Sequence, residues 1–379
     1  MDGYAVRAAR LREYLAADSD NVDLACELAD LLAAEGAPAA AEDVLAGLPD
    51  TLQNTAAVGF RRARLALSTG RYADASQQLS SLVQQGVDAP AVAHDLAFAQ
   101  LCLRQSERAR QTVNDAVAHH GGSTALHILA ARIDLQEQHY DAALAQLRTA
   151  LALDADDAQA HGVTALALFD SNRPEPALQA SVAALQLDGE QHEALLVAGT
   201  LALWNREWPE AQALFERALV RFPNSGRVLS GLGQCLMLRN ELPQAQAVLL
   251  QAVRVMPEHI GTWHALAWTQ LLQGDSDTAY TSYQHAYALD RNFADTHGGL
   301  GLIAVLRDQH AEAEASIERA LRLDRNSITG RYARSLLLQK QGDNAGSEAL
   351  LSELLEAGGM PGVPVAEFAQ RLQHTLSPK

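Results

Sequence analysis

Cysteine is scarce in this sequence, with three residues in 379, at Cys26, Cys102 and Cys235. No pair has CxxC or metal-ligand spacing, so they favour small apolar packing residues in a reducing compartment. No uninterrupted run of about 18 apolar residues is present to cross a bilayer. The opening residues, MDGYAVRAARLREYL, lack the apolar segment of a secretory signal. We therefore expect a soluble, cytoplasmic protein without membrane insertion.

Lysine is nearly absent: Lys340 and Lys379 are the only two, and the other basic residues are arginine. With the abundant alanine, this bias suggests a GC-rich bacterial genome. The formal net charge of −17 disfavours adhesion to nucleic acid or to an anionic membrane surface. The sequence thus favours a basic or mainly apolar protein or peptide partner, and no nucleic acid.

Motifs of catalysis are also missing. No phosphate-binding loop, GxSxG elbow, HExxH helix or CxxC pair occurs. The densest histidine group, His119, His120 and His127, has no cysteine or carboxylate at ligand spacing. A run of aspartates at 154, 156 and 157 lacks the glycine and distant glutamate of a calcium loop, so helix capping explains it better. We expect no enzyme, no cofactor and no metal.

What the sequence contains is a repeat. Within residues 226–259, Leu229, Leu232, Gly233 and Leu236 follow the i, i+3, i+4, i+7 spacing of one helix face. Residues 240–243 then break the pattern before a second helix that ends at Pro257. The same hairpin recurs every 34 residues without insertion or deletion. Ten units start at Val22, Ala56, Pro90, Thr124, Ala158, His192, Gly226, Ile260, Ala294 and Ile328.

Two columns of the repeat hold only small residues, because paired helices can approach closely only where neither carries bulk. Position 8 is alanine, glycine or serine in every unit, and position 20 is alanine in nine units and Ser347 in the tenth. Larger side chains at position 24 are expected to fill the space between hairpins. At the unit boundaries, Asn224, Asn292 and Asn326 are expected to cap the following helices.

This pattern resembles the tetratricopeptide repeat family, whose units have small residues at positions 8, 20 and 27. The family's large residue at position 4 is matched by Trp263, Leu195 and Leu229. Its aromatic residue near position 17 is matched by Tyr72, Tyr140 and Trp208, and its proline at position 32 by Pro223 and Pro257. Departures occur at position 4, which holds Gly59, His127, His161, His297 or Arg331 in other units. The resemblance implies an all-α, right-handed superhelical solenoid of antiparallel helix hairpins.

The predicted organisation has 22 helices. Residues 1–21 form an N-terminal half-repeat helix, residues 22–361 form ten tandem repeats, and residues 362–379 form a C-terminal capping helix and tail. The cap is expected over residues 363–375, because Arg371, Gln373 and His374 give its outer face the polar character that a solenoid end requires.

By the same resemblance, positions 2, 5, 6, 9, 12 and 13 line a concave groove. Position 12 forms an apolar ladder there, and a second interpretation is that this ladder packs the first helices on one another. Trp268 and Trp204 lie off the usual core positions, and tryptophan is enriched at binding hot spots. The predicted partner-binding residues are Trp268, Trp204, Phe169, Met237, Leu271, Arg132, Gln234, His264, Phe98 and Thr200.

The resulting functional hypothesis is a noncatalytic scaffold or adaptor that binds a helical or extended partner segment in its groove. The resemblance implies roles in secretion, pilus or envelope assembly. A lysine-based carboxylate clamp is missing, since no lysine precedes Lys340. Two alternatives remain open: a self-associating structural protein, and a substrate-binding or targeting subunit of a separate enzyme such as a glycosyltransferase.

Overall fold

The computed structural model describes residues 2–356, which form 22 helices and no strand. The chain forms two compact units, Met1–Arg173 and Pro174–Lys379. Unit 1 contains α1 (Asp2–Ala17), α2 (Val22–Ala34), α3 (Pro38–Ala46), α4 (Asp50–Gln53), α5 (Ala56–Ser68), α6 (Tyr72–Gln84), α7 (Pro90–Cys102), α8 (Ser106–His120), α9 (Thr124–Gln136), α10 (Tyr140–Leu153) and α11 (Ala158–Asp170).

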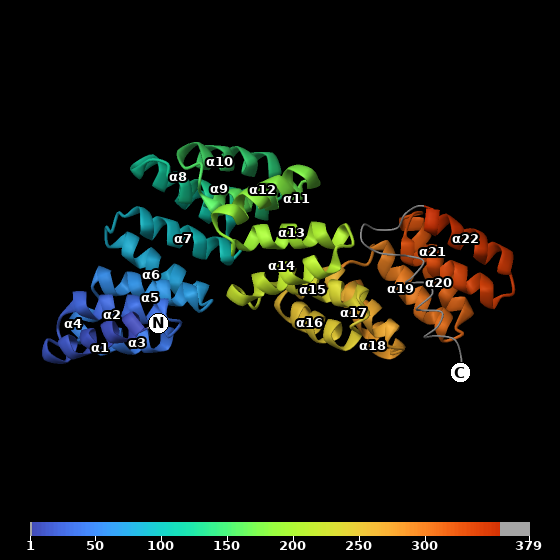
Figure 1. Cartoon of the computed structure of the whole chain (residues 1–379), viewed down its shortest axis with the longest axis horizontal. Helices are drawn as coiled ribbons and strands as arrows, with labels where there is room; N and C mark the ends of the chain where they lie inside the picture. Colours follow the sequence, from blue (N-terminus) through green and yellow to red (C-terminus); the bar gives the residue numbers. More distant parts are fainter. Residues whose placement is uncertain (1, 357–379) are drawn as a thin grey trace. The chain divides into compact units, whose positions relative to one another are not determined.

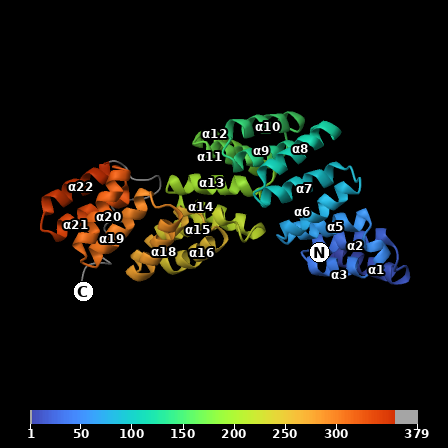
Figure 2. The same ribbon diagram turned by 180° about the vertical axis from the view of Figure 1, so that it is seen from behind.

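Unit 2 continues the same alternation of first and second helices (Figures 1 and 2). It contains α12 (Pro174–Leu187), α13 (His192–Trp204), α14 (Trp208–Arg221), α15 (Gly226–Leu238), α16 (Leu242–Val255), α17 (Ile260–Leu272), α18 (Ser276–Leu289), α19 (Ala294–Leu306), α20 (His310–Leu323), α21 (Ile328–Lys340) and α22 (Asn344–Glu356). Successive helices from α13 to α18 contact one another and lie side by side. The prediction of an all-α superhelical repeat solenoid is confirmed.

The 34-residue register is exact at the level of the helices. Each of the ten first helices begins at the residue that the repeat predicts as position 1, from Val22 to Ile328, and each is 13 residues long. The expected caps lie one residue too early, however. The N-cap is position 34, where Asp157 and Ser327, for example, accept from the backbone N–H three residues later. The Asn292 backbone N–H instead donates to Asp290 at 2.8 Å.

The set of helices differs from the expected one in two places. Pro49 interrupts the second helix of the first repeat, since proline cannot donate to a preceding carbonyl, and a separate turn of helix, α4, follows it. The capping helix expected over residues 363–375 lies outside the described residues. Within residues 2–356, no helix combines the length and the apolar content needed to span a membrane.

The small columns of the repeat lie at buried helix contacts, as predicted, but position 8 faces a large side chain rather than a second small one. All nine alanines at position 20, from Ala41 to Ala313, have no exposed surface. A Cβ atom added to Gly199 would lie 2.8 Å from the Phe215 ring, and one added to Gly233 would lie 2.5 Å from Leu249. Phe215 and Leu249 both occupy position 24. Glycine at position 8 therefore makes room for the large position-24 side chain of the same hairpin.

Position 4 has a role that the sequence did not indicate. His161 Nε2 lies 2.9 Å from the carbonyl of Ala155, and His297 Nε2 lies 2.8 Å from that of Arg291. The Trp263 indole N–H donates to the carbonyl of Pro257 at 2.7 Å. Histidine can thus replace the family's aromatic residue because both supply a ring N–H to the carbonyl six residues earlier.

Position 15 ends every first helix in the left-handed conformation. All ten residues at this position have positive φ: Gly36, Gly70, Arg104, Gln138, Asn172, Arg206, Asn240, Gly274, Asp308 and Gly342. Backbone bonds close the turn in the manner of a Schellman motif, for example His139 N–H to the Asp134 carbonyl at 2.8 Å.

Replacement of an exposed non-glycine residue at this position should therefore stabilise the protein. Gln138 has φ 61°, and a left-handed conformation costs a residue with a Cβ roughly 1 kcal/mol. We expect Gln138→Gly to raise the urea midpoint by an amount equivalent to about 0.5 kcal/mol, because part of the gain is offset by the greater entropy of glycine in the unfolded chain. Gly274→Ala, at the same position with φ 82°, should lower the midpoint. Equal midpoints for both variants would contradict this account.

One contact between first helices is unusually close. A Cβ atom added to Gly298 in α19 would lie 2.5 Å from the backbone nitrogen of Gly330 and 2.9 Å from the carbonyl carbon of Thr329, both in α21. The obstacle is backbone rather than a flexible side chain. The packing of α19 on α21 therefore depends on the missing side chain of Gly298.

Candidate functional site

A pocket in unit 1 lies on the face formed by the first helices of three successive repeats. Its volume is about 410 Å³, and we call it the first-helix pocket. The helix α5 contributes Phe60 and Arg64, the helix α7 contributes its first turns, and the start of α9 closes the third side. The lining residues are Phe60, Arg64, Pro90, Ala91, His94, Asp95, Ser123, Ala125 and Leu126.

The local sequence explains how these residues come together. Phe60, Arg64, His94 and Asp95 stand at positions 5, 9, 5 and 6 of their repeats, so helical spacing places them on the same side of α5 and α7. Pro90 is the first residue of α7, where its missing N–H costs nothing. Ser123 caps α9 and accepts from the Leu126 N–H at 3.3 Å.

The polar side of the pocket is a linked group of three side chains. Asp95 lies between the other two: its Oδ1 lies 3.0 Å from His94 Nδ1, and its Oδ2 forms an ion pair with Arg64 Nε at 3.7 Å. The Arg64 guanidinium also lies 5.9 Å from the centre of the Phe60 ring. The Arg64 side chain is 63% exposed and that of Asp95 only 18%. The guanidinium therefore keeps open donors at the mouth of a mostly apolar pocket.

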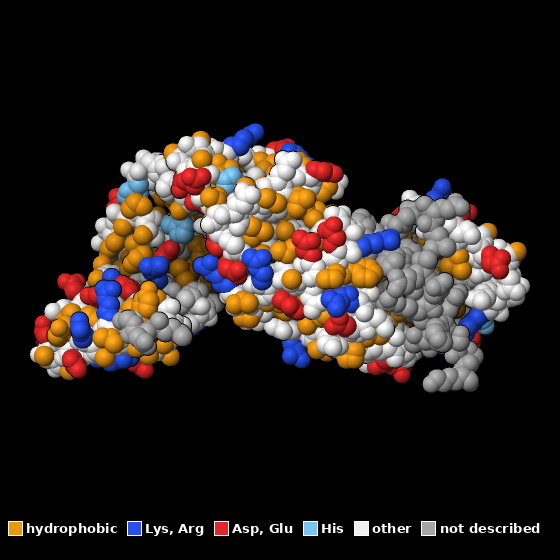
Figure 3. All heavy atoms as spheres, viewed as in Figure 1, with side chains coloured by type: hydrophobic (Ala, Val, Ile, Leu, Met, Phe, Trp, Pro, Cys, Tyr) orange, Lys and Arg blue, Asp and Glu red, His pale blue; other side chains and the backbone are white. Residues whose placement is uncertain are grey.

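The space-filling view agrees with this composition. Over α7, Figure 3 shows histidine and basic side chains beside exposed hydrophobic atoms. Such a surface combines apolar contact area with a few placed polar groups, as ligand and peptide sites commonly do.

The residues predicted to bind a partner are divided between the two units. Phe98, Arg132 and Phe169 belong to unit 1, on α7, α9 and α11, and all three are half-buried. Phe98 lies one helical turn beyond His94, and it packs partly on a core cluster that includes Ala97 and Leu101. The other seven predicted residues belong to unit 2. None of the ten predicted residues lines the first-helix pocket.

In unit 2, the predicted apolar residues differ in exposure. Trp204 is 37% exposed at the end of α13, and Trp268 is half-buried, with its ring 6.5 Å from that of Tyr332. Leu271 has no exposed surface and Met237 only 6%. As placed, the last two offer almost no apolar surface to a partner, which agrees with the interpretation that position 12 packs first helices together.

The predicted polar residues of unit 2 form hydrogen bonds with other residues of unit 2. Thr200 Oγ1 donates to the Leu196 carbonyl at 2.8 Å, and Gln234 Nε2 donates to the Ser230 carbonyl at 3.3 Å. His264 Nε2 lies 2.8 Å from Thr296 Oγ1. The His264 ring also meets the rings of Tyr283 and Phe293 edge to face, at 5.3 and 5.2 Å between centres. Burial lowers the pKa of His264 to about 4, against a smaller opposing effect of Asp295.

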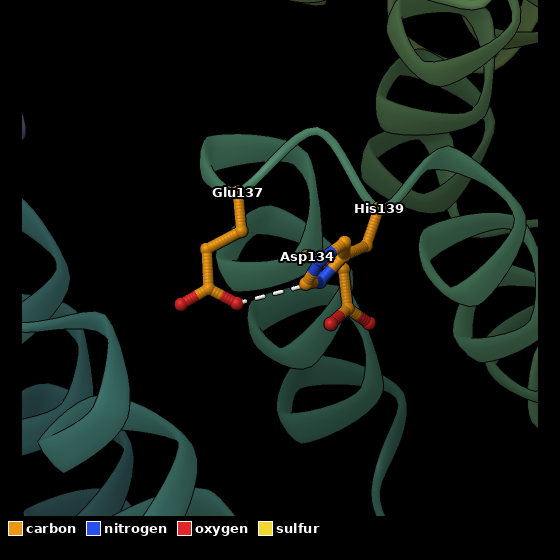
Figure 4. A group of neighbouring side chains, drawn as sticks. All are labelled: Asp134, Glu137 and His139. Carbon is orange, nitrogen blue, oxygen red and sulfur yellow. Dashed lines mark ion pairs between the residues drawn. The ribbon is translucent and has the colours of Figure 1, made fainter.

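One group in unit 1 has the composition of a metal site. Oxygen and nitrogen atoms of Asp134, Glu137 and His139 lie within 4.8 Å of one another, and Figure 4 shows Glu137 directed toward the His139 ring. Arg110 already balances the two carboxylates, at 2.7 Å from Asp134 and 2.5 Å from Glu137. The bond to Asp134 raises the pKa of Arg110. The guanidinium explains how Asp134 can be buried, so we assign the group to an ion network between α8 and α9.

Sequence reasoning placed Phe60, Arg64 and His94 on the groove face but did not include them among the predicted binding residues. The signal that could have found them is their shared face: positions 5 and 9 of two consecutive repeats carry an aromatic, an arginine and a histidine. The ion pair of Asp95 with Arg64 depends on the packing of α5 on α7, and the closing edge at Ser123 depends on that of α7 on α9; repeat spacing specifies neither.

Comparison with solved structures gives similar folds at low sequence identity. Human IFIT1, solved as a dimer with PPP-AAAA, is 16% identical, with 94% of this chain and 91% of that chain covered and a TM-score of 0.54. PilF of Pseudomonas aeruginosa is 19% identical over 60% of this chain and 98% of that chain, with a TM-score of 0.47. YrrB, a TPR protein with an unusual peptide-binding site, is 21% identical over 50% and 97%, with a TM-score of 0.40. The search of curated proteins gives no match.

Family models provide the remaining comparison. Three models described as tetratricopeptide repeat match residues 128–191, 205–267 and 260–293. Each matched stretch contains one complete first helix that starts on the 34-residue register. From the repeat register, the helix hairpins and these matches, we conclude that residues 128–191 and 205–293 consist of tetratricopeptide repeats, and that the same helix register runs through all ten hairpins.

Proposed function

We propose that this protein is a noncatalytic interaction scaffold that binds a segment of a partner protein on the face formed by its first helices. The observation that carries the proposal is the first-helix pocket, which three consecutive repeats build together. Tetratricopeptide repeats support a protein-interaction role, and the proposed location of that role is the first-helix pocket in unit 1.

The pocket suggests how a partner would be held. Phe60, Pro90 and Leu126 offer apolar contact, so a bulky apolar side chain of the partner would enter between α5 and α7. Arg64 at the mouth has donors to spare and would bond to a backbone carbonyl or a carboxylate that follows that side chain. An extended or helical segment would then continue across the first helices of the next repeats.

The predicted binding residues extend this proposal from α7 toward the C-terminal repeats. Phe98, Arg132 and Phe169 would contact the continuing segment in unit 1. In unit 2, the candidates remain Trp204, Trp268, Thr200, Gln234, Met237, His264 and Leu271, of which Trp204 is the most exposed aromatic residue. Met237 and Leu271 would act through the packing beneath the surface, given their burial.

A selected peptide can test the pocket. Peptides would be selected from a random library on the wild-type chain, and the affinity of the enriched sequence would be measured by calorimetry. We expect Phe60→Ala to weaken binding about tenfold or more, because the aromatic floor of the pocket is lost. Tyr14→Ala is the matched control: Tyr14 is a 57% exposed aromatic residue of α1 that does not line the pocket. Equal losses in both variants, or loss only in the control, would contradict the proposal.

We further propose, by family resemblance, that the scaffold acts as an assembly adaptor in the cytoplasm, in secretion, pilus or envelope assembly. Light scattering at several concentrations would separate this role from that of a self-associating structural protein, which should grow in mass with concentration. Co-purification of a catalytic partner in fixed stoichiometry would instead favour a targeting subunit of an enzyme.

A further inference from the structure

We propose that unit 2 contains a binding site for a phosphate group, separate from the partner-binding face. The site is a pocket of about 580 Å³ between the end of α18, the start of α19 and the middle of α20. We call it the Arg291–Arg319 pocket. Its lining residues are Tyr287, Arg291, Asn292, His297, Ala315, Ser316 and Arg319.

The walls of this pocket are fixed by contacts among the lining residues. Arg319 Nη2 donates to Asn292 Oδ1 at 3.0 Å, which holds α20 against the loop before α19. His297 donates from Nε2 to the carbonyl of Arg291 at 2.8 Å. The Tyr287 ring meets that of His297 edge to face, 5.6 Å between centres. The backbone of the loop and one side of each ring are therefore held in place before any ligand arrives.

The charge of the pocket is opposite to that of the whole chain. None of its lining residues is acidic, although the chain carries a net charge of −17. Across residues 2–356, Arg291 and Arg319 form no ion pair, and the only side-chain bond of Arg319 is the one to Asn292. The neighbouring carboxylate of Asp290 accepts from the Asn292 N–H at 2.8 Å. Two guanidinium groups thus face one pocket with most of their donors unused.

Equivalent positions in other repeats show that this arrangement is local. Arg217 stands at the repeat position of Arg319, but it bonds to the carbonyl of Gly189 and lies 3.4 Å from Glu190. Gln251, at that position in the next repeat, bonds to the Pro223 carbonyl. A hydrogen bond from this repeat position to the preceding loop therefore occurs in three repeats. Between α18 and α20 it is combined with Arg291, a second arginine that forms no ion pair within residues 2–356.

The donor set suits a tetrahedral oxyanion. Arginine binds phosphate oxygens through paired N–H groups, and charge-assisted bonds of this kind are about twice as strong as neutral ones. The Tyr287 and Ser316 hydroxyls are further donors in the lining. The volume exceeds that of a bare phosphate ion, so the pocket has room for the group that carries a phosphate monoester.

Titration with inorganic phosphate and with O-phosphoserine tests this site. The side-chain Nε–H signals of Arg291 and Arg319 would be followed by NMR, with sodium chloride added to keep the ionic strength constant. We expect both signals to shift saturably, and Arg291→Gln to weaken the affinity at least about tenfold. Tighter binding of O-phosphoserine would assign the site to a phosphate monoester, and equal binding would assign it to the free anion; both results support an oxyanion site.

Two variants serve as matched controls. Arg217→Gln changes the repeat position of Arg319 where a carboxylate is near, and Arg325→Gln changes the repeat position of Arg291 outside the pocket. Both should bind phosphate like the wild type. Because Arg291 makes no side-chain hydrogen bond within residues 2–356, Arg291→Gln should fold normally, which circular dichroism would verify. Unchanged affinity in Arg291→Gln, an equal loss in a control, or the same shifts with chloride alone would overturn the proposal.

Discussion

Acidification from pH 6.5 to 4 is expected to lower the free energy of unfolding of this protein by about 3 kcal/mol through His264 alone. The side chain lies among Tyr283, Phe293 and Thr296, and burial lowers its pKa to about 4. In this window an unfolded histidine binds a proton and the folded one does not. Stability is therefore complete above pH 6.5 and falls as the pH approaches the pKa of the folded state.

The variant His264→Phe isolates this effect. Phenylalanine keeps the edge-to-face contacts with Tyr283 and Phe293 but cannot bind a proton, so its urea midpoint should depend less on pH between 6.5 and 4. His119→Phe, at an exposed histidine of α8, is the control and should keep the wild-type dependence. A His264→Phe profile parallel to that of the wild type would show that His264 is not the group that titrates.

Gly298→Ala is expected to destabilise the protein by about 2 kcal/mol, although alanine is the better helix former by about 1 kcal/mol. The new Cβ would lie 2.5 Å from the backbone nitrogen of Gly330 and would force α19 and α21 apart. The change in urea midpoint measures the cost, and amide hydrogen exchange in α21 should rise with it.

The control for this prediction is Gly47→Ala at the end of α3. Its added Cβ would meet only backbone oxygens at 3.5 Å, an ordinary contact, and its φ of −72° suits alanine. This variant should be as stable as the wild type or slightly more so. If Gly298→Ala were equally stable, the close approach of α19 and α21 would not contribute to folding.

The helices could be predicted from sequence because their determinants are local and repeated. Small residues at positions 8 and 20 and large ones at position 24 specify the hairpin, and the start of every first helix follows from the register. The break at Pro49 was missed because α3 and α4 together fill one second-helix position. The predicted N-caps were wrong by one residue. Asn292 was expected to cap α19, but its own backbone N–H donates to the side chain of Asp290, and the cap is the next residue.

The candidate site was harder to predict, because exposure is a tertiary property. Leu271 and Trp268 stand on the same helix and both fit the groove positions, yet the first is fully buried and the second only half-buried. The pairing of Asp95 with His94 and Arg64 joins α5 to α7 and depends on how consecutive repeats pack. Neither fact is contained in the repeat spacing.

The constant interval between first helices has a consequence for how such a gene can change. Ten helices start 34 residues apart without a single offset. Unequal crossing-over between any two copies would therefore remove or add whole hairpins and leave the small-to-large contact between positions 8 and 24 intact on both sides of the junction. Adding or removing whole 34-residue units therefore leaves each remaining residue at the same position of its repeat, whereas one residue inserted within a helix would turn the rest of that helix's apolar face by about 100°.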